Sequence, residues 1–216
     1  VACGDAAPEK SGGAQDAGKA DSAISADAPL IISFGDSLYA GYQLGQKEGL
    51  APVLQAALKD AGVDARVQNA GVSGDTTAAG LQRLKFVLDN AAKKPDLFLV
   101  GLGGNHMLRG IGPEQTRANL TAILDELAKR DIPVVLTGMK VSPNMGKAYA
   151  AEFEAIYPQL GNRDGVTLYP FILDGVITDP NLMLDDHLHP NAKGVAKMVE
   201  ALAPVVVKAL PEKTAP

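Results

Sequence analysis

Short apolar runs alternate with helical repeats of apolar residues from position 30 onward. The runs are typical of buried strands, and they cover 30–34, 64–68, 96–104, 133–139 and 165–171. Between and after them, apolar side chains recur at the three- and four-residue spacing of one helix face. These repeats predict helices over Leu50–Leu58, Leu81–Leu88, Leu120–Leu127, Ala148–Leu160 and Val195–Leu202.

Residues that favour helix ends support several of these helices. Gly62 is placed to end the first helix, and Asp75 or Thr76 can cap the second. Pro113 stands where proline is favoured at the start of a helix. Pro204 is expected to break or kink the last helix, because proline lacks the backbone N–H that a helix interior needs.

The alternation of strand and helix predicts an α/β fold. Repeated β-α units imply a three-layer α/β/α sandwich around a central, mostly parallel five-stranded sheet. The chain has 216 residues, enough for one domain, which we place at 30–210 with a flexible tail at 211–216. Ligands of such sheets bind beyond the carboxyl ends of the strands, so the loops there are where chemistry is expected.

Residues 1–29 differ from the rest in composition. They are mostly Ala, Gly, Ser and Asp, with too little apolar surface to offset chain entropy, and are expected to form a disordered tether. Small residues before Cys3 resemble the cleavage site of a bacterial lipoprotein. The chain is then expected in the periplasm or cell envelope, tethered to a membrane through lipidated Cys3; an accidental exposed cysteine is the alternative.

Charge and cysteine content exclude several kinds of function for this protein. Twenty basic against 25 acidic residues give a net charge of −5, which argues against binding to nucleic acid. No apolar run approaches the ~20 residues needed to cross a bilayer. A single cysteine excludes an intrachain disulfide and a thiolate metal cluster.

Three loops after predicted strands carry candidate catalytic groups. Ser37 in "GDSLYAGY" is a candidate nucleophile, Gly74 in "VSGDT" exposes backbone N–H groups, and the Asn105 amide in "GGNH" can donate to an oxyanion. Each has an ordinary alternative: Ser37 can cap a helix, and Gly74 and Asn105 can serve only the turns that hold them. "GLGG" lacks the further residues that a phosphate-binding loop requires.

The segment "DDHLHP" holds two of the three histidines. Asp186 and His189 are three residues apart, so a turn can bring the carboxylate to one ring nitrogen while the other points outward. The alternative is a metal site on His187 and His189, which would need further ligands.

Taken together and in this order, "FGDSL", "SGDT", "GGN" and "DDHLHP" resemble the four sequence blocks of the SGNH (GDSL) hydrolase family. "SGDTTAAGLQRL", "GGNHMLRG" and "PNMGKAY" are similar to its branch of bacterial thioesterase I, protease I and lysophospholipase L1 enzymes, which includes arylesterases. The resemblance covers roughly Leu30–Ala203. It implies a flavodoxin-like sheet and a serine hydrolase of carboxylic esters that needs no cofactor and no metal.

The resemblance also implies residue roles. Ser37 would be the nucleophile, His189 the general base and Asp186 its orienting partner. The N–H groups of Ser37 and Gly74 and the Asn105 side chain would form the oxyanion hole. His106 departs from the pattern, because this branch usually has aspartate there; it is expected either to alter pH dependence or acyl preference, or to face solvent with little effect.

Substrate choice is the least determined property. The candidates for lining an acyl pocket are Met107, Leu108, Ile111 and Met145, which follow the third and fourth strands. Short, open surfaces favour small acyl or aryl esters, with acyl thioesters and lysophospholipids as further substrates. The competing functions are a carbohydrate O-deacetylase of the same fold, a non-catalytic tethered binding protein, and a metal-dependent hydrolase.

Overall fold

A computed structural model describes residues 24–25 and 27–212 of the chain. Cys3, nearly all of the expected tether at 1–29 and residues 213–216 of the expected tail lie outside the described residues. In the part of the chain that is described, no helix is both long enough and apolar enough to cross a membrane.

The core of the fold is a five-stranded sheet in the order β2-β1-β3-β4-β5. Every neighbouring pair of strands is parallel. The strands are β1 (Leu30–Gly35), β2 (Arg66–Gly71), β3 (Leu97–Gly101), β4 (Val134–Thr137) and β5 (Val166–Tyr169). The predicted α/β class and parallel sheet are confirmed.

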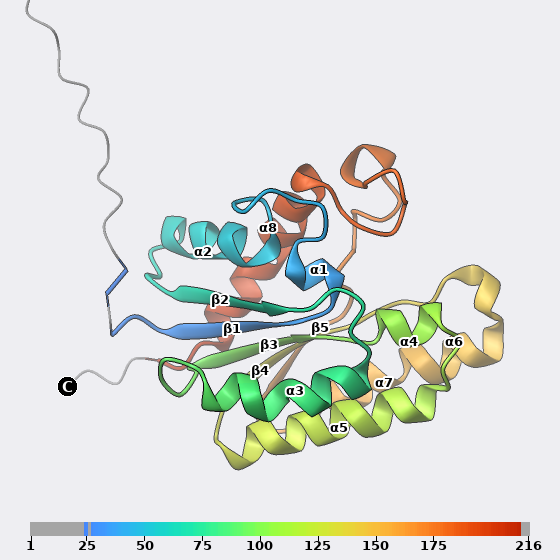
Figure 1. Cartoon of the computed structure of the whole chain (residues 1–216), viewed down its shortest axis with the longest axis horizontal. Coiled ribbons are helices and arrows are strands. Elements are labelled where there is room, and N and C mark those ends of the chain that lie inside the picture. Colours follow the sequence, from blue (N-terminus) through green and yellow to red (C-terminus); the bar gives the residue numbers. More distant parts are fainter. Residues whose placement is uncertain (1–23, 26, 213–216) are drawn as a thin grey trace, which may run out of the picture.

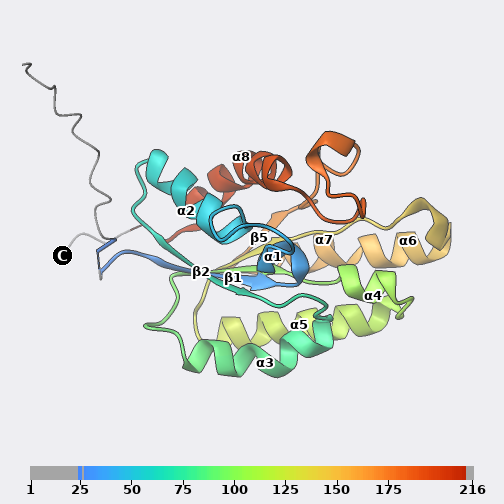
Figure 2. The same ribbon diagram turned by 45° about the horizontal axis from the view of Figure 1, so that its top comes forward.

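Helices cover both faces of this sheet. On one face lie α2 (Leu50–Asp60) and α8 (Ala192–Ala209); on the other lie α3 (Thr77–Asp89), α5 (Pro113–Lys129), α6 (Lys147–Glu154) and α7 (Ile156–Gly161) (Figure 1). The turned view shows the same three layers (Figure 2). Successive strand side chains point to opposite faces, so Ile31 joins one apolar cluster while Ile32 and Phe34 join the other.

Several predicted elements differ in detail. The second strand begins at Arg66 and runs to Gly71, and the helix predicted over Ala148–Leu160 is divided at Ala155 into α6 and α7. The expected break at Pro204 is wrong, since α8 continues through it to Ala209. Burial of one face of α8 against α2 and the sheet outweighs the single backbone hydrogen bond that proline removes.

Four short elements were not predicted from the sequence. Two are α-helices and two are 3-10 turns, and all lie in loops: α1 (Ser37–Ala40), α4 (Gly104–Leu108), η1 (Pro143–Met145) and η2 (Pro180–Leu182). None is long enough to show a helical repeat of apolar residues.

Glycines at the ends of three strands bring α1 close to the sheet. Gly35 pairs in register with Gly71 on β2 and with Gly101 on β3. A Cβ added at Gly35 or Gly101 would lie within 2.5 Å of the ring atoms of Tyr39, and one at Gly71 would meet the backbone of Ala40. Side chains at these positions would therefore push α1, and with it Ser37, away from the strand ends.

Candidate active site

Ser37 stands at the carboxyl end of β1 as the first residue of α1. Asp36 caps this helix, its carboxylate accepting the Leu38 N–H at 3.1 Å. Tyr39, the third residue of α1, is buried and its hydroxyl pairs with the Thr137 hydroxyl on β4 at 2.6 Å. Ser37 thus caps nothing itself and stands on a short helix that is fixed to the sheet from both ends.

A chain of two hydrogen bonds connects Ser37 to His189 and Asp186. His189 Nε2 lies 2.8 Å from Ser37 Oγ, and His189 Nδ1 lies 2.7 Å from Asp186 Oδ2. The ring of Tyr42 packs against the imidazole, with 4.5 Å between ring centroids. The first three residues are predicted from the sequence, which carries no signal for Tyr42 beyond its place in the loop after α1.

The turn that holds Asp186 and His189 is built by the aspartate itself. Asp186 Oδ1 accepts the backbone N–H groups of Leu188 and His189 at 2.9 and 3.0 Å. Desolvation pushes the pKa of Asp186 upward, but these N–H groups and the His189 ring outweigh it and lower the pKa to about 2. Between them, His187 has φ of 54°, a left-handed conformation uncommon outside glycine and asparagine.

Asp36 presents a second carboxyl group beside Ser37. Its side chain is buried, with 3% of the residue exposed, yet it lines the cavity in front of Ser37. Desolvation raises its pKa to about 6, although the Leu38 N–H and the nearby His189 act in the opposite direction. Asp36 therefore favours its neutral form far more than Asp186 does.

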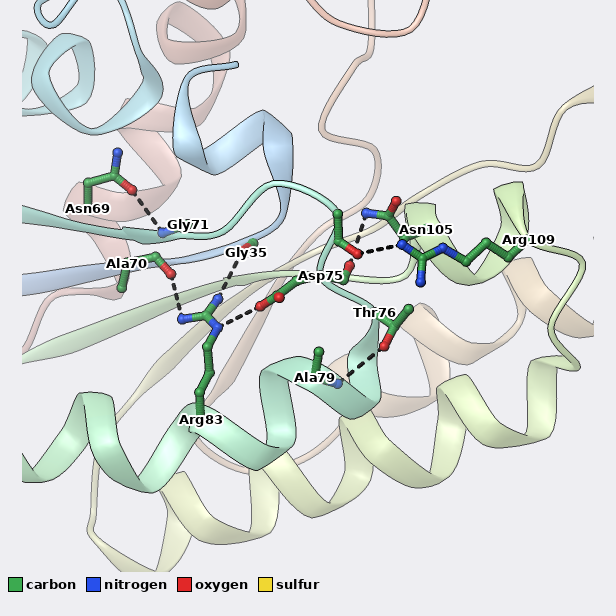
Figure 3. Close-up of polar contacts among 11 residues, drawn as sticks. Gly35, Asn69, Ala70, Gly71, Asp75, Thr76, Ala79, Arg83, Asn105 and Arg109 are labelled. Carbon is green, nitrogen blue, oxygen red and sulfur yellow. Dashed lines mark hydrogen bonds and ion pairs between the residues drawn. The ribbon is translucent and has the colours of Figure 1, made fainter. Parts of the chain in front are cut away.

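Asn105 and Gly74 come from adjacent loops and are linked through Asp75. The Asn105 side-chain amide donates to the Asp75 carbonyl at 3.0 Å, which leaves its second N–H free for a ligand (Figure 3). The backbone N–H groups of Ser37 and Gly74 donate to no group within the described residues. Gly74 has φ of 86°, so a side chain there would be strained.

His106 points into the protein, which contradicts the solvent-facing alternative. Only 1% of the residue is exposed. Its Nδ1 lies 2.8 Å from the Thr116 hydroxyl and its Nε2 lies 3.2 Å from the Thr77 hydroxyl. Burial first, and then the Arg109 charge, lower its pKa, so the imidazole is held neutral. Because α4 turns Asn105 and His106 in different directions, His106 is not among the residues that line the cavity.

A cavity of about 840 Å³ opens beside Ser37 and lies within the size range of ligand pockets. It is lined by Met107, Leu108 and Met145 as the sequence predicted, and also by Met139, Phe171 and Leu188. Ile111, the fourth residue expected there, is not among the residues that line it. The Ile111 N–H donates to the His106 carbonyl, and the Ile111 carbonyl accepts from the Tyr149 hydroxyl.

His187, the other residue of the metal alternative, is exposed and lines the cavity. Within the described residues, no group of three or more His, Cys, Asp or Glu side chains is placed to hold a metal ion.

Arg83 is the polar residue at these strand ends that the sequence analysis missed. It lies in the second turn of α3 and pairs with the Asp75 carboxylate at 2.5 Å (Figure 3). By sequence Asp75 is only a candidate helix cap, and Thr76 fills that role instead by accepting the Ala79 N–H at 3.2 Å. An arginine within "GLQRL" reads as an exposed position of a helix, so the pattern alone gives no sign of its inward contacts.

A serine linked through histidine to aspartate, at the carboxyl edge of a parallel α/β sheet, is an arrangement typical of serine hydrolases. The sequence model of the GDSL-like Lipase/Acylhydrolase family matches residues 33–197. The chain belongs to this family.

Named relatives agree on the reaction class. An "Arylesterase" of Vibrio mimicus is 40% identical over 189 residues, covering 88% of this chain and 94% of the relative. "Thioesterase 1/protease 1/lysophospholipase L1" of Escherichia coli (strain K12) is 37% identical and covers 78% of each chain. The solved structure of AlinE4, an SGNH-hydrolase family esterase, is 50% identical, with a TM-score of 0.73 over 86% of this chain and 98% of that one. The chain is a carboxylic ester hydrolase.

Proposed function

We propose that the protein hydrolyses small acyl and aryl esters through an acyl-enzyme intermediate on Ser37. The observation that carries this proposal is the 2.8 Å contact between His189 Nε2 and Ser37 Oγ, with Asp186 on the other ring nitrogen at 2.7 Å. A carboxylate at Nδ1 fixes the tautomer in which Nε2 accepts the serine proton, and it stabilises the imidazolium that forms.

The reaction proceeds in two steps. Ser37 Oγ attacks the acyl carbonyl as His189 takes its proton, and the imidazolium then gives that proton to the leaving alcohol or thiol. In the second step, water attacks the acyl-enzyme as His189 takes its proton, and the imidazolium returns that proton to Ser37 Oγ as the acyl–oxygen bond breaks and the acid is released. The Asn105 amide and the N–H groups of Ser37 and Gly74 are the proposed donors to the oxyanion in both steps.

Acyl thioesters and lysophospholipids are the wider substrate classes that we propose for the same site. The names of the relatives include both activities. A panel of p-nitrophenyl esters, acyl-CoA, lysophospholipid and acetylated xylan ranks these classes and tests the carbohydrate O-deacetylase alternative against them.

Replacement of Ser37 tests the central proposal. Ser37→Ala should lower kcat on p-nitrophenyl butyrate by on the order of 10⁴-fold or more, since the nucleophile is lost. Ser25→Ala, a change at an exposed serine that precedes β1, is the matched control and should keep full activity. A fluorophosphonate probe should label the wild type at Ser37. A folded wild type that neither turns over ester nor takes the label would favour the tethered binding protein instead.

We also propose an envelope location with lipid on Cys3. The support is compositional: small residues flank the cysteine, and a polar stretch separates it from the domain. Cell fractionation and the mass of the N-terminal peptide test this, and unmodified Cys3 in a soluble fraction would contradict it.

A further inference from the structure

The Arg83 side chain reaches from α3 to the ends of two strands and to the loop after the second. Its Nη2 donates to the Gly35 carbonyl on β1 at 3.0 Å, and its Nη1 donates to the Ala70 carbonyl on β2 at 2.8 Å. Its Nε donates to the Asp75 carboxylate at 2.5 Å. Figure 3 shows the three contacts fanning out from one guanidinium.

Two of these contacts lead directly to the proposed oxyanion donors. Gly35 is two residues before Ser37, so its carbonyl fixes the strand end from which Ser37 emerges. Asp75 follows Gly74, and the Asp75 carbonyl holds the Asn105 amide at 3.0 Å. One side chain therefore connects the backbone before Ser37, the loop of Gly74 and the side chain of Asn105.

The surroundings of Arg83 make this connection rigid. The side chain is 20% exposed and that of Asp75 is 10% exposed, so water competes little for their hydrogen bonds. The guanidinium also lies 4.0 Å from the centre of the Phe34 ring on β1. A planar fork with donors on all three nitrogens can satisfy one carboxylate and two carbonyls at once, whereas lysine, a flexible point charge, cannot hold that geometry.

We propose that Arg83 is a positioning residue for the oxyanion hole. Through Asp75 it sets the distance and direction of the Asn105 amide and of the Gly74 N–H relative to Ser37. The proposal rests on the proposed function of these groups. It assigns to Arg83 an effect on the transition state, where the oxyanion forms, and little effect on binding of the ground-state ester.

Kinetics of Arg83→Met separate positioning from simple support of the fold. A misplacement on the scale of 1 Å in a catalytic group can cost about 10²-fold, so we expect kcat on p-nitrophenyl butyrate to fall about 10- to 100-fold. KM should stay within about threefold, because the cavity itself is unchanged. Rates are expressed per site labelled by fluorophosphonate, so that loss of folded protein does not count as loss of kcat.

Two further variants refine this test. Arg83→Lys keeps the charge but not the fork, and should recover less than about a tenth of the lost kcat. Asp75→Asn keeps the backbone and both contacts of Arg83 with the strands. It should lower kcat by less than Arg83→Met does, but measurably below the wild type. It also provides the test if Arg83→Met does not fold. Arg163→Met is the matched control, since it removes an arginine–carboxylate pair, with Asp125, at the opposite edge of the sheet; its kcat should match the wild type.

A double-mutant cycle with Asn105→Ala decides whether Arg83 acts through Asn105. If it does, adding Arg83→Met to Asn105→Ala should lower kcat by clearly less than it does in the wild type. Effects that multiply would overturn the route through Asn105, and an unchanged kcat per labelled site in Arg83→Met would overturn the whole proposal even when thermal stability falls. A wild type without Ser37-dependent turnover would instead overturn the proposed function, so the two failures are distinguishable.

Discussion

Asp36 and Asp186 are carboxylic acids in one site that the fold treats in opposite ways. Asp186 accepts two backbone N–H groups and the His189 ring, and its pKa of about 2 keeps it ionised. Asp36 accepts the Leu38 N–H in a buried setting, where desolvation raises its pKa to about 6. Environment, and not residue type, therefore decides which acid partners the imidazole.

The raised pKa of Asp36 predicts a pH dependence of stability. The folded state keeps the Asp36 proton up to about pH 6, while the unfolded chain loses it near its ordinary pKa of 3.8. The stability that Asp36 contributes is therefore complete at low pH and lost as pH rises toward 6, by up to about 3 kcal/mol at ~1.4 kcal/mol per pH unit. The asparagine in Asp36→Asn stays neutral at every pH. As pH rises from 4 to 7, the free energy of unfolding of Asp36→Asn should therefore increase relative to that of the wild type.

Urea denaturation at a series of pH values measures this difference. Asp60→Asn, a change at an exposed carboxylate on α2, controls for the general effect of removing one acid. A difference between Asp36→Asn and wild type that stays flat from pH 4 to 7 would contradict the raised pKa.

His106 predicts a pH dependence of the opposite sign. Because its pKa is lowered, the imidazole becomes protonated in the unfolded chain as pH falls through about 6.5, while it stays neutral in the folded chain. The stability from the neutral buried imidazole is then present above that pH and lost as pH falls below it. His106→Gln should lose stability relative to the wild type at pH 7, and this deficit should shrink toward pH 5. His187→Gln controls for removal of an exposed imidazole, and a deficit independent of pH would contradict the prediction.

Sequence motifs located the proposed catalytic residues but not the residues that support them. Ser37, Asp186 and His189 could be named because the motifs that hold them, taken together and in order, resemble the sequence blocks of one hydrolase family. Arg83 belongs to α3, whose repeat only indicates a buried and an exposed face, and His106 belongs to α4, which is too short to show a repeat. Whether an arginine reaches inward, or a histidine finds two buried hydroxyls, depends on residues far apart in the chain.

At the scale of elements, long amphipathic helices and apolar strands were predictable, and the short helices that carry the site were not. α1 and α4 have four and five residues, too few for a repeat, and they form where glycines let the chain approach the sheet. The opposite error occurred at Pro204, where local preference predicted a break or kink and tertiary packing continues the helix without a break.

Pro204 gives a prediction about the helix itself. It is exposed, and its missing N–H leaves the Glu200 carbonyl without its helical partner. Pro204→Ala should therefore raise the free energy of unfolding, by on the order of 1–3 kcal/mol. Ala201→Pro, at another exposed position of α8, should lower it by about 3 kcal/mol or more. Urea denaturation with an unchanged m-value measures both, and a Pro204→Ala variant less stable than the wild type would show that proline serves the packing of α8.

At the scale of the whole molecule, the parallel sheet brings loops from distant parts of the chain to one edge. The cavity is lined from the ends of β1, β3, β4 and β5 and from the turn that holds His189. The alternation of elements predicted this edge, but it could not predict the size of the cavity, because that depends on how the loops pack against one another.

The cavity predicts the response to acyl length. Its volume of about 840 Å³ exceeds the need of an acetyl group, and Met107, Met139 and Met145 line it. Each CH₂ buried against such side chains contributes about 0.8 kcal/mol, so kcat/KM on p-nitrophenyl hexanoate should exceed that on the acetate until the cavity is full. Met107→Trp fills part of the space and should lower the hexanoate-to-acetate ratio by about 10-fold or more, leaving acetate within about threefold.

The matched control for that change is an apolar residue remote from the cavity. Phe86 on α3 is 69% exposed, and Phe86→Ala should leave the ratio of the two esters unchanged. If Met107→Trp lowered hydrolysis of both esters equally, Met107 would act on the reacting groups and not on the acyl chain. If the ratio did not change at all, the acyl chain would lie in another part of the cavity. Met145→Trp would then be the next test. If that change also left the ratio unchanged, the cavity would not be the acyl site.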